Sequence, residues 1–252
     1  MNGQMEDAEI RAQLDLAAQV QLGLLPQPHR RLAGWETAFS YQAAGHISGD
    51  YLDLIEHGQD AFYFILGDVS GKGIAASLLM SHLHASLRVL LASHNSLEEV
   101  VRETSRLFCH SSLPAQFATL AIGHATNAGD VKLVNAGHTP VMLARQGGVD
   151  VFSSTGMPLG MFCATDFAAT QFVAEPDHSL FLYSDGVTEA EGPDGSEYGA
   201  DRVQQKLADL AGRRPEDIIV AMKSDLESFV AAPELADDRS MLALRFVGSE
   251  LP

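Results

Sequence analysis

The sequence has few cysteines, few cations and no long apolar run. Cys109 and Cys163 are its only cysteines, and they lack the spacing of a zinc-thiolate site. We therefore expect neither such a site nor a disulfide framework, and we interpret both residues as small apolar side chains of the core. No run approaches the ~20 apolar residues of a membrane span, and the N-terminus lacks the form of a signal peptide. These absences predict a cytoplasmic protein.

Positive charge is scarce throughout the chain. There are 16 Lys and Arg residues against 33 Asp and Glu residues, which gives a formal net charge of −17. Nucleic-acid binding needs a basic surface, and an anionic membrane would repel this chain. We therefore expect neither nucleic acid nor membrane as a partner. A solvated acidic surface explains most of the carboxylates, but a few occupy positions where solubility is no explanation.

Apolar periodicity predicts blocks of strands and helices. The expected helices cover residues 6–25, 74–92, 96–109, 200–211 and 215–230. The expected strands are near 35–44, 50–55, 61–66, 116–124, 130–135, 141–144, 167–173, 179–183 and 240–247. Because most strands are joined by hairpins, antiparallel sheets are expected. We predict an α+β fold in which two stacked, mainly antiparallel sheets carry a helix pair on each outer side.

The stretch from Gly67 to Gly73 combines an acid at the end of an apolar strand with three glycines. A buried carboxylate needs a cation or hydrogen-bond donors, and the glycines allow the backbone to turn sharply and approach a ligand. A P-loop is excluded, because the spacing is one residue short and Gly73 replaces the Ser or Thr that would hold magnesium. Two interpretations stay open for Asp68: a metal-binding residue, or the capping residue of an ordinary strand-to-helix turn.

Four acidic sites share this pattern of an acid at a strand end beside glycine or another acid. They are Asp50, Asp68, Asp185 and Asp237-Asp238. Clustered carboxylates repel one another, so these groups are either dispersed in space or built around hard divalent ions. Oxygen ligands without His or Cys favour Mg²⁺ or Mn²⁺ over zinc, and two such ions can activate a water for in-line attack on phosphorus. Spacing alone does not exclude four unrelated turn aspartates.

Seven motifs together resemble those of the PPM (PP2C-like) metal-dependent serine/threonine phosphatases, specifically the bacterial SpoIIE/RsbU branch. They occur in the order of that family and cover the chain from about 20 to 247. The motifs are Leu24-Leu25-Pro26, Ser48-Gly49-Asp50-Tyr51-Leu52-Asp53, Gly67-Asp68-Val69-Ser70-Gly71-Lys72-Gly73, Asn135-Ala136-Gly137-His138, Pro158-Leu159-Gly160, Tyr183-Ser184-Asp185-Gly186-Val187-Thr188-Glu189-Ala190 and Asp237-Asp238-Arg239-Ser240. The resemblance implies a four-layer α/β/β/α sandwich.

The resemblance also implies a site for two Mn²⁺ or Mg²⁺ ions. Asp68 would bridge both ions, with Asp68 and Asp185 as the catalytic residues. Asp185 and Asp237 would complete one metal site, while Asp50 and the Val69 carbonyl would serve the other. The arginine that eukaryotic relatives use to hold the substrate phosphate has no clear counterpart, so the group that binds the phosphate stays open.

Four further residues attract attention beside these motifs. We expect Asp238 to lie outside the ligand set and Asp53 to have a supporting or structural role. His138 could act as a general acid, but we favour a turn histidine that fixes the local backbone. Lys72 could approach a phosphate as a point charge or be an ordinary solvated loop lysine.

The function that these observations predict is a Mg²⁺/Mn²⁺-dependent protein phosphatase acting on phosphoserine or phosphothreonine. The resemblance implies a phosphorylated STAS-type anti-sigma-factor antagonist as the substrate. The main alternative is a catalytically silent module of the same fold that only binds such a partner. Hydrolysis of small phosphate esters is a second alternative.

The N-terminal helix is expected to be regulatory. We divide the chain into a linker or regulatory helix at 1–28 and the phosphatase domain at 29–252. The helix carries a short a/d-like seam at Ile10, Leu14, Ala17, Gln21 and Leu24. Because a helix this short is marginal in water, the seam should pack either on its own domain or on a second copy. The resemblance implies an upstream sensor or receiver domain, and pairing would give a homodimer.

Overall fold

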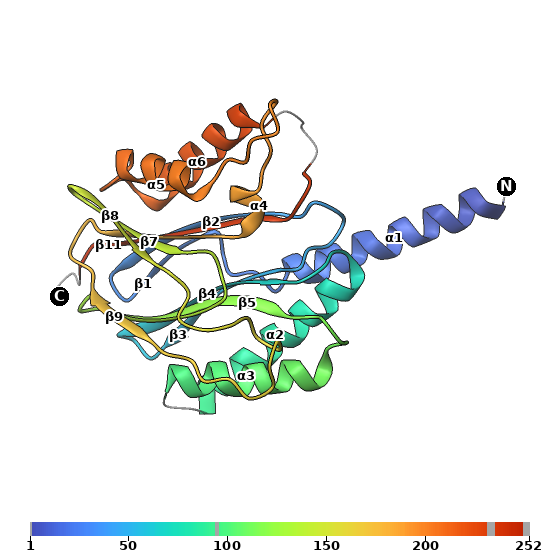
Figure 1. The fold of residues 1–252 in the computed structure, drawn as a ribbon, viewed down its shortest axis with the longest axis horizontal. Helices are drawn as coiled ribbons and strands as arrows, with labels where there is room; N and C mark the ends of the chain where they lie inside the picture. Colours follow the sequence, from blue (N-terminus) through green and yellow to red (C-terminus); the bar gives the residue numbers. More distant parts are fainter. Residues whose placement is uncertain (1, 94–95, 231–234, 249–252) are drawn as a thin grey trace.

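The computed structural model of the protein describes residues 2–93, 96–230 and 235–248. Two stacked β-sheets form its centre, and helices cover both outer faces (Figure 1). Helices α2 (Ile74–Ser93) and α3 (Leu97–Ser111) cover one sheet, and α5 (Ala200–Asp209) and α6 (Pro215–Phe229) cover the other. The predicted α+β sandwich with a helix pair on each outer side is therefore confirmed.

Within the described residues, sheet A has the strand order β1-β2-β11-β10-β7-β8, and sheet B has the order β3-β4-β5-β6-β9. All pairings between neighbouring strands of these sheets are antiparallel. The strands are β1 (His29–Leu32), β2 (Trp35–Gln42), β3 (Asp50–His57), β4 (Ala61–Val69), β5 (Ala118–Thr126), β6 (Asp130–Ala136), β7 (Val141–Arg145), β8 (Gly148–Phe152), β9 (Thr170–Val173), β10 (Ser179–Tyr183) and β11 (Arg239–Phe246).

Strand β4 shows how the apolar layers are built. Its side chains alternate, as a period of two residues requires. Phe62, Phe64 and Leu66 lie in the apolar layer between the two sheets. Tyr63 and Ile65 lie on the opposite face, in the layer that includes α2 and α3. Both faces of this strand are thus buried, which explains its nearly continuous apolar sequence.

Local signals placed most helices correctly. Helix α3 begins as predicted, because the Ser96 hydroxyl accepts a hydrogen bond from the Glu99 amide at 3.4 Å. The elements that were missed are β1, β8 and the single turn α4 (Asp185–Thr188). The two strands lie at the edges of sheet A, where a strand does not need two apolar faces. A single helical turn is too short to show a period of 3.6 residues.

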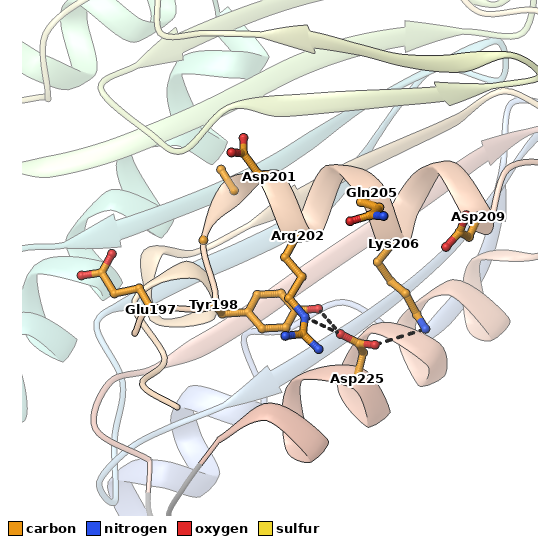
Figure 2. A pocket seen from close by; sticks show the side chains of 10 residues that line it. Glu197, Tyr198, Asp201, Arg202, Gln205, Lys206, Asp209 and Asp225 are labelled. Carbon is orange, nitrogen blue, oxygen red and sulfur yellow. Dashed lines mark hydrogen bonds and ion pairs between the residues drawn. The ribbon is translucent and has the colours of Figure 1, made fainter. Parts of the chain in front are cut away.

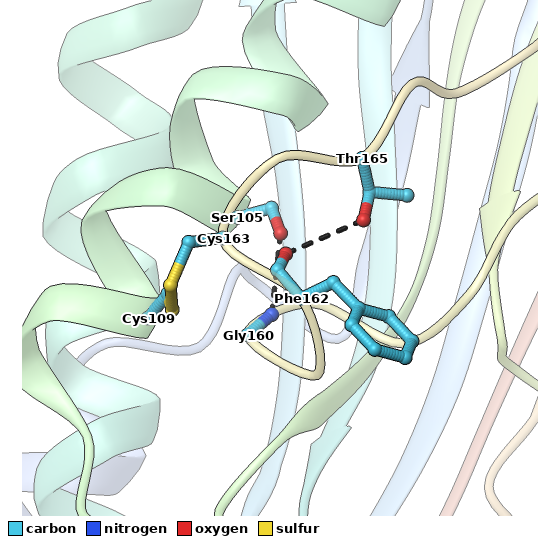
Figure 3. The surroundings of a disulfide bond; sticks show 6 residues. All are labelled: Ser105, Cys109, Gly160, Phe162, Cys163 and Thr165. Atoms are coloured by element: carbon cyan, nitrogen blue, oxygen red, sulfur yellow. Dashed lines mark hydrogen bonds between the residues drawn. A yellow bond between two sulfur atoms is a disulfide. The ribbon is translucent and has the colours of Figure 1, made fainter.

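The interpretation of the two cysteines as simple core residues was wrong. Cys109 on α3 and Cys163 in the loop before β9 form a disulfide (Figure 3). The same loop is held to α3 by a hydrogen bond from the Gly160 amide to the Ser105 hydroxyl at 3.2 Å. Their separation of 54 residues gave no signal, because the pairing depends on how the loop folds back over the helix.

Helix α1 (Asn2–Leu22) extends away from the sandwich, with the N-terminus at its far end (Figure 1). Its C-terminal end is anchored, because the buried Gln21 amide donates to the Ser48 carbonyl at 2.8 Å and accepts from the Ser48 amide at 2.9 Å. The Asp15 carboxylate also lies 3.1 Å from His46 Nδ1. Ile10, Leu16 and Val20 on the same helix are exposed. Contacts with its own domain therefore leave part of the apolar surface of this helix uncovered.

Helix α2 is the one helix in the described residues that is long and apolar enough, by length and composition alone, to cross a membrane. Part of its surface packs on the layer between sheet B and α3. The buried residues are Ala76, Met80, Leu83, Leu87 and Leu91. Packing on sheet B therefore accounts for this part of its apolar composition.

Candidate metal centre

Asp50 and Asp68 lie side by side on neighbouring strands of sheet B, where they are register partners of the β3–β4 pair. By the alternation of these strands, both side chains face the space between the sheets. A Cβ atom on Gly49 would lie 2.9 Å from the Val69 carbonyl oxygen and 3.4 Å from Asp68 Oδ1. Glycine at this position therefore lets the backbone approach both oxygen atoms closely.

The other predicted acids come from sheet A. Asp185 is the first residue of α4, directly after β10, and Asp237 precedes β11, the neighbour of β10. The two loops approach closely at Gly186, where a Cβ atom would lie 2.1 Å from the Asp238 carbonyl oxygen. The fold thus brings the acidic ends of β10 and β11 together, as sequence spacing alone could not show.

A hydrogen bond joins the two groups of acids across the sandwich. The Ser184 hydroxyl donates to Asp50 Oδ2 at 3.0 Å, so the residue before Asp185 on sheet A holds Asp50 on sheet B. Asp50 is buried, and its second carboxylate oxygen, Oδ1, has no hydrogen-bond partner among the described residues. A buried carboxylate oxygen without a partner is costly, so this atom is a candidate ligand position.

Burial and mutual repulsion raise the pKa values of three acids of this cluster. Burial, together with the nearby Asp50, Asp185, Asp237 and Asp238 carboxylates, raises the pKa of Asp68 to about 9. Burial is also the main cause that raises the pKa of Asp50 to about 7. For Asp185, burial and then Asp237 raise the pKa. Such shifts show that the protein itself supplies too little positive charge to this cluster.

The donor set fits a hard divalent cation. It consists of carboxylate oxygens and a backbone carbonyl, the ligands that Mg²⁺ and Mn²⁺ prefer. The buried Asp50 Oδ1 without a partner and the raised pKa values point the same way. In the part of the chain that the structure describes, however, no group of three or more His, Cys, Asp or Glu residues forms a recognisable metal-ligand cluster. The four aspartates are brought near one another without their oxygens converging on one point.

Both carboxylate oxygens of Asp238, the residue that we exclude from the proposed ligands, accept hydrogen bonds from backbone amides. Its Oδ1 accepts from the Ala44 amide at 2.7 Å, and its Oδ2 accepts from the Gly49 amide at 2.8 Å. Both oxygens therefore hold the loop before Asp50. Its neighbour Asp237 is more exposed and is free of such backbone anchors from the 44–49 loop.

Lys72 is an exposed loop lysine with an ionic partner, and its approach to a phosphate stays a prediction. Its ammonium group lies 2.9 Å from Asp237 Oδ2 and donates to the Ala236 carbonyl at 2.6 Å. It therefore brings the 67–73 loop to the segment before β11. The ion pair also supplies a positive charge to Asp237, one of the four acids.

Asp53 has the structural role that we expected. It is fully buried, and its carboxylate receives two hydrogen bonds from the Arg88 guanidinium on α2, at 2.8 and 2.9 Å. The Tyr51 hydroxyl and the Leu54 amide donate to it as well. These bonds fasten β3 to α2 and leave Asp53 no part in the acidic cluster.

His138 is not suited to act as a general acid near neutral pH. It is buried, and burial lowers its pKa to about 4, although the Tyr183 carbonyl partly opposes this shift. Its Nδ1 atom lies 2.7 Å from the Thr119 hydroxyl, and its amide donates to the Asn135 side chain at 2.8 Å. The neutral ring therefore joins elements, in a role close to the turn histidine that we favoured.

The depressed pKa of His138 predicts acid sensitivity. The pKa of His138 is 6.5 in the unfolded chain and about 4 in the folded chain. Between these two pH values, the imidazole is protonated in the unfolded chain and neutral in the folded chain. The contribution of His138 to stability should therefore fall as the pH drops through this window, by at most about 3 kcal/mol, while the raised pKa values of Asp50 and Asp68 act in the opposite direction. His138→Gln should remove this part of the pH dependence, and His110→Gln, at an exposed position on α3, should not. Denaturant titrations between pH 7 and 4 measure the free energy of unfolding of the wild type and of both variants. The same change of this free energy with pH in all three proteins would contradict the assignment.

A pocket with a volume of about 770 Å³ lies along α5, and none of the four acids lines it (Figure 2). Both cations that line it are paired with the same carboxylate. Asp225 accepts from the Tyr198 hydroxyl at 2.8 Å and pairs with Arg202 and Lys206 at 3.1 and 3.3 Å. The positive charge of this pocket is therefore already neutralised by Asp225.

Comparison with known proteins identifies the family. The sequence profile described as Stage II sporulation protein E (SpoIIE) matches residues 58–247, which is most of the chain. The chain belongs to the SpoIIE family. The family and the solved structures that it resembles make it a PP2C-like domain of the SpoIIE/RsbU branch, as the motifs predicted.

Two curated proteins resemble this SpoIIE-family chain over much of its length. Protein IcfG of Synechocystis sp. is 26% identical over 271 residues, covering 96% of this chain and 42% of IcfG. Phosphoserine phosphatase RsbU of Bacillus subtilis is 24% identical over 190 residues, covering 74% of this chain and 56% of RsbU. The chain thus spans about half the length of these relatives.

Solved structures share the fold of this SpoIIE-family chain. The SiaA-PP2C domain of Pseudomonas aeruginosa matches with a TM-score of 0.83 at 18% identity, covering 96% of this chain and 98% of that domain. A structure of the PP2C phosphatase domain and a regulatory fragment of SpoIIE from Bacillus subtilis matches with a TM-score of 0.75 at 20% identity, covering 89% and 65%. At 18% and 20% sequence identity, these two structures establish the fold of the chain and nothing further.

Sequence reasoning missed the residues that support the SpoIIE-family cluster. Ser184 holds Asp50, Gln21 holds Ser48, and Arg88 neutralises Asp53. Ser184 had a signal, since it directly precedes Asp185 in a recognised motif. Gln21 and Arg88 had none, because each acts on a residue more than 25 positions away along the chain.

Proposed function

We propose that this domain is a Mg²⁺/Mn²⁺-dependent protein serine/threonine phosphatase. The observation that carries the proposal is that Asp50 and Asp68 of sheet B lie near Asp185 and Asp237 of sheet A, with a hydrogen bond from Ser184 to Asp50 joining the two sheets. The raised pKa values of Asp50, Asp68 and Asp185 call for added positive charge, and carboxylate oxygens suit hard cations. Membership of the SpoIIE family supplies the phosphatase class.

The proposed ligands follow from the positions of the acids. Asp68 would bridge the two ions, Asp185 and Asp237 would complete one site, and Asp50 with the Val69 carbonyl would serve the other. Two bound ions would supply an activated water for in-line attack on phosphorus. The chain would orient these ligands through the bond from Ser184 to Asp50 and the bonds that Asp238 accepts from the backbone. Lys72 would have to share or release Asp237 when a cation binds.

The proposed substrate is phosphoserine or phosphothreonine on a folded protein partner. Support comes from the relative whose name states phosphoserine phosphatase activity. We propose a phosphorylated STAS-domain anti-sigma-factor antagonist as that partner, in bacterial signalling in the cytoplasm. With a net charge of −17, neither nucleic acid nor an anionic membrane is proposed as a partner.

The alternative is a catalytically silent module that binds the same partner. This alternative is favoured by one observation: among the described residues, the acids do not form a recognisable metal-ligand cluster. Turnover of a phosphoserine-bearing STAS protein, measured as phosphate release with Mn²⁺ and with a chelator, separates the two. Release that requires Mn²⁺ supports the enzyme, whereas binding without release supports the silent module. Faster turnover of small phosphate esters than of the phosphoprotein would overturn the proposed substrate.

We further propose that residues 1–28 are a linker or regulatory helix, that 29–252 form the phosphatase domain, and that α1 mediates a homodimer. Ile10, Leu16 and Val20 are exposed on α1, so an apolar surface is available to a partner. An upstream sensor or receiver domain could then act through this helix.

Removal of residues 1–20 should convert a dimer into a monomer while the metal centre persists, because Gln21 and its bonds to Ser48 remain. Light scattering should therefore report half the mass for the shortened chain. Leu16→Glu with Val20→Glu in the full chain is a second way to disrupt the same surface. Equal masses for all three proteins would reduce α1 to a passive extension.

A further inference from the structure

The connection between β6 and β7 crosses from sheet B to sheet A beside the acidic cluster. It contains the 135–139 turn, whose own bonds make it rigid. The Asn135 side chain accepts from the His138 amide at 2.8 Å and donates to the Thr139 carbonyl at 3.0 Å. Gly137 has a φ of 70°, and a Cβ atom there would lie 2.5 Å from the Pro158 ring. The turn is therefore held in one conformation.

One side of this turn contacts sheet B next to Asp68. His138 Nδ1 lies 2.7 Å from the hydroxyl of Thr119 on β5. Thr119 is the register partner of Asp68 on β4, and directly opposed residues project from the same face of a sheet. The imidazole thus contacts the strand position beside the proposed bridging ligand.

The other side of the turn contacts sheet A next to Asp185. The Thr139 hydroxyl donates to the carbonyl of Tyr183, the last residue of β10. Ser184 and Asp185 follow directly, and Ser184 holds Asp50. Two adjacent residues of one turn therefore contact both sheets at the positions that carry proposed ligands.

We propose that Thr119, His138 and Thr139 form a strut between the sheets that sets the spacing of Asp68 and Asp185 for metal binding. These three are positioning residues, since each acts through another group and none belongs to the proposed ligands. The inference rests on the proposed function, because it assumes that those two aspartates bind the same ion. Loss of such supporting bonds typically weakens metal affinity by about 10- to 100-fold.

The test is Mn²⁺ affinity of the full-length chain, measured by titration calorimetry. Thr139→Val and Thr119→Val remove one hydroxyl each at nearly constant volume, and we expect the Mn²⁺ dissociation constant to rise about tenfold or more. Thr139→Ser and Thr119→Ser keep the hydroxyl and should stay within about twofold of wild type. The matched control is Thr37→Val, at a buried threonine of sheet A whose hydroxyl donates to the Arg30 carbonyl at 3.2 Å.

Melting curves without metal separate positioning from stability. A purely structural strut would lower the melting temperature of the valine variants and leave Mn²⁺ affinity unchanged, and that result would overturn the proposal. An equal loss of affinity in Thr37→Val would overturn it too. If Thr139→Val does not fold, Thr119→Val decides. If the wild-type chain binds no Mn²⁺, the proposed function fails and this inference falls with it.

Discussion

Asp68→Asn should lower Mn²⁺-dependent phosphate release by more than about a hundredfold, because a neutral amide is a much weaker ligand for a hard dication than a carboxylate. Burial, together with repulsion from four neighbouring acids, raises the pKa of Asp68 to about 9. The variant should therefore fold at least as well as wild type in the absence of metal. Asp185→Asn, Asp237→Asn and Asp50→Asn should lose activity in the same way.

The matched control is Asp60→Asn, which alters an aspartate just before the opposite end of the same strand. There Asp60 accepts from the Asn127 side chain at 2.7 Å, in an exposed turn. Its replacement should leave turnover within about twofold, as for a surface residue away from the site. Near wild-type turnover of Asp68→Asn at saturating Mn²⁺ would show that Asp68 does not bridge two ions.

Arg88→Met should lower the free energy of unfolding by about 3 kcal/mol, because it leaves the buried Asp53 carboxylate without its charged partner. Denaturant titration at neutral pH measures this loss. The control is Arg106→Met, whose partner Glu103 lies at 2.9 Å on the surface of α3. An exposed pair of this kind contributes at most about 0.5 kcal/mol. Equal losses in the two variants would show that Asp53 does not depend on Arg88.

The sandwich could be predicted because its strands are buried on two faces or alternate clearly. The apolar runs of Ala61 to Leu66 and of β11 follow directly from the apolar layers on either side of each sheet. Strands β1 and β8 could not be predicted, since an edge strand contacts fewer neighbours and keeps fewer apolar residues. The disulfide between Cys109 and Cys163 depends on the path of a loop, which no local pattern encodes.

The sequence allowed the acids of the site to be found, because they lie at strand ends. It did not allow the residues that hold these acids in place to be found. Asp50, Asp68, Asp185 and Asp237 each follow or precede a recognisable strand. The bonds from Gln21 to Ser48 and from Lys72 to Asp237 join segments 27 and 165 residues apart, so they exist only once the layers are assembled. The sequence therefore predicted candidate ligands, and the fold adds what holds them.

The central claim is that the aspartates of both sheets bind two divalent ions. A crystal structure of the full chain grown with Mn²⁺, examined by anomalous scattering, tests it directly. We predict two manganese peaks among Asp50, Asp68, Asp185 and Asp237, with Asp68 between them and Lys72 moved away from Asp237. No peak among these residues at millimolar Mn²⁺, or manganese bound only elsewhere on the acidic surface, would contradict the account.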